Sequence, residues 1–240
     1  MEFMPEHAPL SVLAFLGTTF LEGLATLVLL LALWKKKKWI AGGAAAFAAV
    51  LLSAYFTVLL GVSLTSHEKL LAPGERKYFC EIDCHIAYSE VSVEETGALG
   101  DESHQIRAAG RFVIVRLKTW FDPSTISLNR GNGELAPNPR RLLLVDDLGN
   151  NIPPATQAQA ALAHLRGATT PLVQPLRPGD SYVTDLVFDV PTNARHPRLF
   201  VGDDFDMPDR LLIGHEDSYL HKKIYLGLSP HQEISAGRVP

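Results

Sequence analysis

Two long apolar runs near the N-terminus constrain this chain more than any other feature. The first extends from Leu10 to Trp34 and contains a single charged residue, and the second extends from Trp39 to Leu64 and contains none. Each run is longer than the roughly 20 residues that a helix needs to cross a bilayer. The sequence therefore predicts a two-helix transmembrane hairpin over residues 10–64.

The connection between the two runs indicates the direction and orientation of the helices. It consists of four lysines flanked by two tryptophans, namely Trp34, Lys35, Lys36, Lys37, Lys38 and Trp39. A loop this short makes two spanning helices antiparallel. Basic loops stay in the cytoplasm, and tryptophans favour the headgroup layer. We therefore expect loop 35–38 to be cytoplasmic in a bacterial inner membrane, with both termini and the main domain in the periplasm.

The first run is predicted to be a retained helix and not a cleaved secretory signal. It lacks a basic n-region and is longer than the apolar core of a signal peptide. The outer N-terminal segment 1–9 carries Glu2 and Glu6 and no Lys or Arg, which also favours an outer N-terminus.

Glu22 is the one charged residue inside the first predicted helix. It lies 13 residues before Lys35, or about 20 Å along a helix axis. An ionisable group at that depth is costly unless it is paired or neutral, and such groups are often functional. We favour a neutral Glu22 that is hydrogen-bonded within the membrane, with proton transfer as the alternative. The side chain is expected to face protein and not lipid.

The second predicted helix begins with a tract of small residues. Residues of this kind allow helix backbones to approach closely inside a membrane. The tract is broad enough to suggest a helix partner beyond the hairpin. The residues that we expect to pack against another helix are Gly42, Gly43, Ala45 and Ala49.

The rest of the chain reads as a β-rich domain behind a polar connector, residues 65–76. Short β-branched or alternating segments end at turn signals such as Asp-Pro-Ser and Asp-Asp-Leu-Gly. Strands are expected within 82–88, 112–121, 142–145, 182–190, 199–201, 211–213 and 223–228. A single helix is expected over 156–166. Many short strands without alternating helices predict an antiparallel β-sandwich over 77–228, followed by a tail, 229–240.

Four segments of this domain carry a resemblance to a known group. They are Trp120-Phe-Asp-Pro-Ser, Leu144-Val-Asp-Asp-Leu-Gly, Leu176-Arg-Pro-Gly-Asp-Ser-Tyr and Val187-Phe-Asp-Val-Pro191. In this order they resemble the telokin-like immunoglobulin-fold domains of bacterial lipoproteins and membrane proteins, over roughly residues 85–203. The resemblance implies an immunoglobulin-like sandwich in the cell envelope with a binding or structural role and no shared catalytic site. The lipidation cysteine of the lipoproteins is missing here, where the helical hairpin takes its place.

The most chemically suggestive segment is Cys80-Glu-Ile-Asp-Cys84-His85. Two cysteines in one straight strand at this spacing would lie about 13 Å apart, so a disulfide needs a bulge or turn at Ile82-Asp83. We favour a disulfide or two packed thiols, because neighbouring cysteines outside the cytoplasm are usually bridged. A copper site or a haem attachment site remains open as an alternative, since thiolate and imidazole suit soft metals.

The topology is also similar to that of subunit II of cytochrome oxidases, in which a two-helix hairpin carries an outward-facing β domain. The dinuclear copper motif of that family has a His four residues after its second cysteine, near the end of the domain. Here Tyr88 occupies that position, and the cysteines lie at the start of the domain. The resemblance therefore does not extend to the copper motif.

The charge of the chain and the motifs that it lacks argue against two classes of function, nucleic-acid binding and catalysis by a nucleophile. Residues 39–240 carry a net charge of −5, which argues against nucleic acid as a partner. No nucleophile elbow or triad context is recognisable. We therefore expect a non-enzymatic accessory subunit of a bacterial membrane complex, of respiratory or photosynthetic type, without a cofactor. Its partners would be membrane protein subunits and the lipid bilayer. The alternatives are a redox, copper- or haem-handling protein using Cys80, Cys84 and His85, and an envelope sensor that binds a ligand.

Overall fold

The computed structural model describes residues 8–81, 84–101, 105–204, 207–229 and 232–233. These residues fall into two compact units. A hairpin unit contains residues 8–68 together with 207–223, and a sandwich unit contains residues 69–204 together with 224–233. The expected sandwich of residues 77–228 is therefore interrupted, because residues 207–223 belong with the helices.

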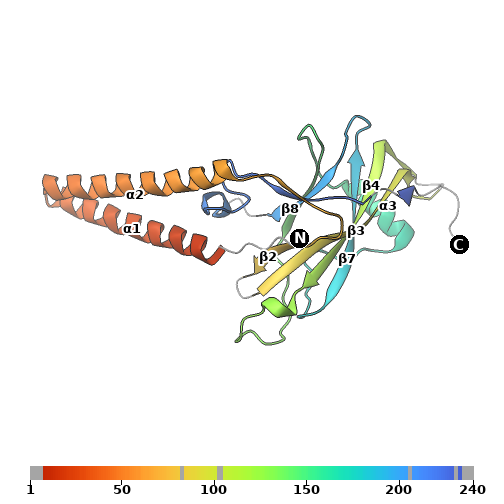
Figure 1. The fold of residues 1–240 in the computed structure, drawn as a ribbon, viewed down its shortest axis with the longest axis horizontal. Coiled ribbons are helices and arrows are strands. Elements are labelled where there is room, and N and C mark those ends of the chain that lie inside the picture. Colours follow the sequence, from red (N-terminus) through yellow and green to blue (C-terminus); the bar gives the residue numbers. More distant parts are fainter. Residues whose placement is uncertain (1–7, 82–83, 102–104, 205–206, 230–231, 234–240) are drawn as a thin grey trace. The chain divides into compact units, whose positions relative to one another are not determined.

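The hairpin consists of α1 (Ala8–Trp34) and α2 (Lys38–Thr65), both shown in Figure 1. Both are long and apolar enough to cross a membrane. The chain reverses over three residues between them, and Lys36 takes the left-handed conformation there with φ 54°. The antiparallel hairpin predicted from the two apolar runs is confirmed.

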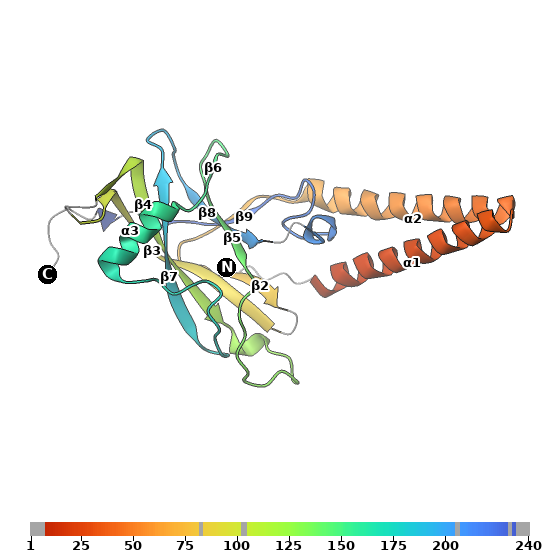
Figure 2. The same ribbon diagram turned by 180° about the vertical axis from the view of Figure 1, so that it is seen from behind.

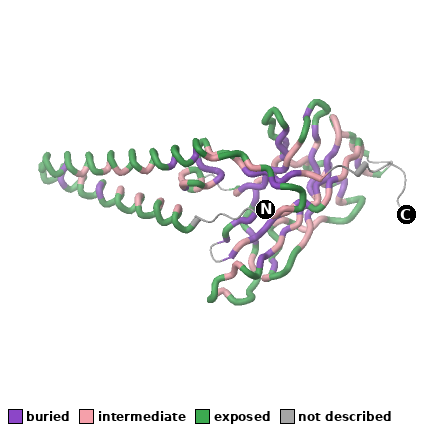
Figure 3. The backbone as a smooth tube through the Cα atoms, in the orientation of Figure 1, coloured by how far each residue is buried: buried purple, intermediate pink, exposed green. Residues whose placement is uncertain are grey.

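The two helices bury one narrow stripe each, while most of their surface is exposed (Figure 3). The less exposed positions of α1 are Ser11, Phe15, Thr18, Glu22, Ala25, Leu29 and Ala32. They recur at alternating intervals of four and three residues, the heptad spacing of a packed helix pair. The corresponding stripe of α2 contains Ala41, Ala44, Ala48, Leu51, Tyr55, Leu59 and Ser63. These two stripes form what we call the seam of the hairpin.

The sandwich contains ten strands and one α-helix within the described residues. The strands are β1 (Lys69–Leu71), β2 (Lys77–Glu81), β3 (Cys84–Leu99), β4 (Ile106–Phe121), β5 (Arg140–Val145), β6 (Asn151–Ile152), β7 (Ser181–Val190), β8 (Arg198–Asp203), β9 (Ile224–Leu226) and β10 (Gln232–Glu233). The helix, α3 (Thr156–Arg166), has the bounds that the sequence predicts.

The strands form two sheets. One has the order β10-β3-β4-β7, with β2 also paired to β3, and the other has the order β1-β9-β8-β5-β6. Pairing is antiparallel except between β1 and β9 and between β10 and β3. The predicted combination of a helical hairpin with an antiparallel-rich β-sandwich is confirmed.

Side-chain alternation along β4 explains how its sheet is buried on both faces. Val113, Val115 and Leu117 point into the core between the two sheets. Phe112 and Ile114 point to the opposite face, where they pack with α3 through Ala158, Ala161 and Leu162. In Figure 2 α3 lies over this sheet, beside β4 and β7.

Several local expectations need correction. The connector 65–76 contains β1, which pairs with β9. Residues 211–213 form the end of a 3₁₀ helix (η2, Asp209–Leu211) and a turn, where a strand was expected. A short apolar run does not by itself distinguish a strand from a packed turn. The tail contributes β10, and its remaining residues beyond Ser229 lie outside the described residues.

Candidate functional site

Glu22 lies on the seam of the hairpin. The side chain is half-buried, and its Oε1 atom is buried without a hydrogen-bond partner among the described residues. The nearby Thr19 hydroxyl, a local candidate partner, instead donates to the carbonyl of Phe15 in its own helix (2.9 Å). The described residues of the hairpin therefore leave this one oxygen without a hydrogen bond.

The predicted packing residues of α2 lie on the exposed side of the helix. Gly42, Gly43, Ala45 and Ala49 are all exposed, while the seam uses Ala41, Ala44 and Ala48 of the same tract. We call the exposed group Gly42, Ala45, Ala46 and Ala49 the small-residue face. The sequence could identify the tract, but hydropathy cannot distinguish one side of an all-apolar helix from another.

The turn between the helices presents its charges and aromatic rings outward. Lys35, Lys36, Lys37 and Lys38 are exposed, and so are Trp34 and Trp39 on either side. An exposed basic turn between two tryptophans has the composition of a membrane–water boundary.

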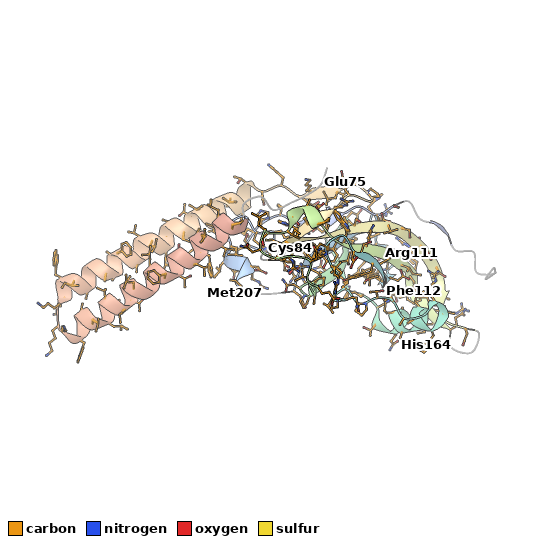
Figure 4. All side chains as sticks on the ribbon, turned by 90° about the horizontal axis from the view of Figure 1, so that it is seen from below. Glu75, Cys84, Arg111, Phe112, His164 and Met207 are labelled. Atoms are coloured by element: carbon orange, nitrogen blue, oxygen red, sulfur yellow. The ribbon has the colours of Figure 1, made fainter. Side chains whose placement is uncertain are left out.

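Cys80, Cys84 and His85 do not converge on one site. Residues 82–83, where a disulfide would need a bulge or turn, lie outside the described residues, but the register pairs Glu81 with Cys84 and Cys80 with His85. Cys84, labelled in Figure 4, is 2% exposed in the core, and its thiol contacts the Glu81 carbonyl at 3.6 Å. Cys80 is exposed on the other face, and the two cysteines are not joined by a disulfide.

Of the three residues of the motif, only Cys80 and His85 lie side by side, as a cross-strand pair. Residues directly opposite each other in an antiparallel ladder share one face and lie side by side. Burial lowers the pKa of His85, and the nearby Asp122 acts in the opposite direction. The Nδ1 atom of His85 is buried and has no hydrogen-bond partner among the described residues. This arrangement favours a neutral imidazole beside an exposed thiol.

A cluster of buried charges lies between the two sheets and was not anticipated from the sequence. Arg140 of β5 pairs with Glu81 of β2 and Asp203 of β8, and its Nε donates to the Tyr88 hydroxyl at 3.3 Å. The guanidinium carbon lies 4.1 Å from the centre of the Phe79 ring. Burial raises the pKa of the Glu81 carboxyl, an effect that Arg140 partly offsets. Burial also raises the pKa of Tyr88 to about 12.

Lys77 belongs to the same interior. It is almost completely buried, and its Nζ donates to the carbonyls of Val201 (2.6 Å) and Ile224 (3.0 Å). These carbonyls lie where the pairing of β8 with β9 ends, before the chain leaves the sandwich for residues 207–223. The cluster therefore joins the two sheets at the base of that excursion. We assign it a structural role.

Three of the four segments that carry the family resemblance form turns, and the fourth, Val187–Pro191, lies at the end of β7. The Asp122 carboxylate accepts from the Ser124 amide at 2.8 Å, and the Asp180 carboxylate accepts from the Arg177 amide at 3.0 Å. The Asp146 carboxylate accepts from the Asn150 amide at 2.8 Å, and hydrogen bonding to Asn150 lowers the pKa of Asp146. These aspartates therefore have local structural roles.

A cavity of about 650 Å³ lies beside α3. Its lining includes Ile106, Ala160 and Ala161, together with Gln157 and the exposed His164 near the end of α3. Gly100 and Asp101 also line the cavity. It contains no group of convergent catalytic side chains among the described residues.

Neither a known family model nor a curated protein sequence matches the chain. Among solved structures, it is similar to MPT63, a secreted protein from Mycobacterium tuberculosis, with 9% identity over 68% of this chain and 99% of that chain and a TM-score of 0.43. An uncharacterized β-sandwich protein from Clostridium difficile 630 has 10% identity over 68% of this chain and 96% of that chain, with a TM-score of 0.37. A conserved hypothetical protein from Bacillus anthracis has 15% identity over 55% and 87%, with a TM-score of 0.39. What this protein does must be inferred from its own residues.

Proposed function

We propose that this protein is a non-enzymatic accessory subunit of a bacterial membrane complex. The hairpin spans the inner membrane with its lysine turn in the cytoplasm. The sandwich, of the telokin-like immunoglobulin type, lies in the periplasm, where it braces the complex or docks a partner.

The observation that carries this proposal is the carboxyl group of Glu22. A carboxyl in the middle of a membrane helix is costly unless another group satisfies it. Its Oε1 has no hydrogen-bond partner among the described residues of the hairpin. Because the side chain is only half-buried, a polar group on a third helix, supplied by another subunit, would bond the carboxyl group from its accessible side.

The small-residue face supports the same proposal. The two helices pack through Ala41, Ala44 and Ala48 and leave Gly42, Ala45, Ala46 and Ala49 exposed. Small side chains lower the distance at which a further helix can approach, and membrane helices associate through such surfaces. The hairpin thus offers a second packing surface beyond its own seam.

The proposal is tested by purifying the protein from its native membranes in a mild detergent and identifying what accompanies it by quantitative mass spectrometry. We expect a stoichiometric set of membrane subunits. Glu22→Leu should reduce their recovery severalfold while membrane insertion, measured by alkaline extraction, stays unchanged. Thr19→Leu is the matched control, because the Thr19 hydroxyl is already bonded to its own helix. Recovery of the protein alone would contradict the proposal.

A second candidate is a soft-metal or redox function at Cys80 and His85. The exposed thiol of Cys80 and the imidazole of His85 lie on one face of the strand pair, where they offer a metal one sulfur and one nitrogen ligand. Cys84 is buried on the opposite face, so this candidate has two ligands and not three. A metal analysis and an absorption spectrum of the purified protein test it, since a colourless, metal-free protein would remove it.

A further inference from the structure

Residues 207–220 lie against the membrane hairpin and present apolar side chains outward. We call them the interfacial segment. Its exposed residues include Met207 (56% exposed, labelled in Figure 4), Tyr219 (47%) and Leu220 (65%). Glu216 and Asp217 are buried, whereas Asp209 is half-buried and Arg210 is exposed. Asp217 pairs with Lys223 at 2.6 Å. Asp and Glu side chains are mostly exposed in proteins surrounded by water, so the burial of two of them in this segment is unusual.

Hydrogen bonds fix this segment to both helices. The Ser11 hydroxyl of α1 donates to the Ile213 carbonyl at 2.7 Å, and the Tyr55 hydroxyl of α2 donates to the Leu211 carbonyl at 2.6 Å. Just after the segment, the Lys222 amide donates to the Ser66 hydroxyl at 2.8 Å. The segment therefore has a defined height along the hairpin.

That height coincides with the outer boundary of a bilayer. Tyr55 lies 16 residues beyond Trp39, or about 24 Å along a helix that rises about 1.5 Å per residue. Ser11 lies 23 residues before Trp34, or about 35 Å along α1. With the tryptophans at the inner boundary of a hydrocarbon core of about 30 Å, the outer boundary lies between these two levels. The segment bonded to Ser11 and Tyr55 lies at that depth.

We propose that the interfacial segment inserts its exposed apolar side chains into the outer leaflet of the lipid bilayer. Lipid would then cover both the exposed surface of the helices and the exposed apolar side chains of the segment. Tyr219 has the amphipathic ring that is enriched at membrane interfaces. The inference rests on the proposed membrane insertion of the hairpin, and adds that the chain contacts lipid at a third place, remote from the helices in sequence.

The test measures the depth of spin labels in the full-length protein, reconstituted into vesicles of phosphatidylethanolamine and phosphatidylglycerol. Labels are placed by Leu220→Cys and, separately, Met207→Cys, in a background of Cys80→Ser and Cys84→Ala. Phe20→Cys on the exposed surface of α1 is the hydrocarbon reference, and Leu128→Cys, fully exposed in the sandwich unit, is the aqueous reference. Collision rates with oxygen and with a water-soluble nickel chelate report the depth of each label.

Labels at 207 and 220 are expected to exclude the nickel chelate severalfold better than the label at 128, and to lie shallower than the label at 20. If both match the label at 128 while the label at 20 is in hydrocarbon, the interfacial segment lies in water and the inference is wrong. If the label at 20 is itself accessible to the chelate, the membrane span is wrong and the inference fails with it.

Discussion

At the scale of single residues, buried charges between the two sheets hold the sandwich together. Arg140 is 1% exposed at its side chain and contacts carboxylates of two strands, Glu81 from one sheet and Asp203 from the other. A buried ion pair gives little net stability over an apolar pair, because both ions lose their hydration. Removing one partner is a different matter, since it leaves the other charge buried and uncompensated.

Arg140→Met is therefore expected to lower the free energy of unfolding by about 3–5 kcal/mol. Glu81→Gln in the same protein should restore part of that loss, because it removes the orphaned carboxylate. Urea unfolding in detergent micelles, followed by near-ultraviolet circular dichroism of the sandwich, measures both effects.

An exposed ion pair provides the control for this prediction. Arg177 and Glu134 pair at 3.2 Å with both side chains more than half exposed. Arg177→Met should change the stability by no more than about 1 kcal/mol. Equal losses at Arg140 and Arg177 would show that the buried cluster has no special part in joining the sheets.

At the scale of elements, no further strand covers the edge strand β7 among the described residues; side chains and a backbone bridge between Pro154 and Phe188 close that edge. The Gln159 amide of α3 donates to the Asp185 carbonyl (2.7 Å) and its oxygen accepts from the Val187 amide (2.9 Å). The Thr169 hydroxyl accepts from the Asp185 amide at 2.7 Å. Open strand edges invite pairing with other chains, so these contacts protect the sandwich from edge-to-edge association.

Gln159→Leu is expected to destabilise the sandwich by about 1–3 kcal/mol, because it leaves a strand amide and a strand carbonyl unpaired. It should also promote self-association through β7. Thermal unfolding and sedimentation in detergent measure the two effects. Gln157→Leu, an exposed substitution on the same helix, is the matched control. An unchanged Gln159→Leu protein would mean that the edge is protected in another way.

The elements differ in how far sequence patterns predict them. Long apolar runs located α1 and α2, and the alternating segment at 182–190 located β7, each within a few residues, and α3 has the predicted bounds. The β-branched run at 112–121 located only the second part of β4, which begins six residues earlier at Ile106. β1 and β2 were missed because they are short and pair with partners distant in sequence. The register of β2 and β3 also determines that the two cysteines of the motif do not meet. Cys80 and Cys84 lie on adjacent strands of a hairpin and point to opposite faces. No local pattern specifies such pairings before the turn is known.

At the scale of the whole molecule, one chain builds two units that are interleaved in sequence. Residues 207–223 leave the sandwich between β8 and β9 and fold against the helices. The sequence predicted a strand at 211–213 and not this excursion, because its Leu-Leu-Ile run is as compatible with a strand as with a packed turn. Within the described residues the chain thus passes between the units at three places, namely between residues 68 and 69, between residues 204 and 207, and between residues 223 and 224.

The central claim is that the hairpin binds other membrane subunits, and photocrosslinking within native membranes tests it most directly. A benzophenone amino acid replaces Ala45 on the small-residue face or, as the control, Phe20 on the exposed surface of α1. The account predicts a covalent adduct between residue 45 and a distinct membrane protein, and lipid adducts at residue 20. Lipid adducts alone at both positions would contradict it and leave the hairpin as an anchor only.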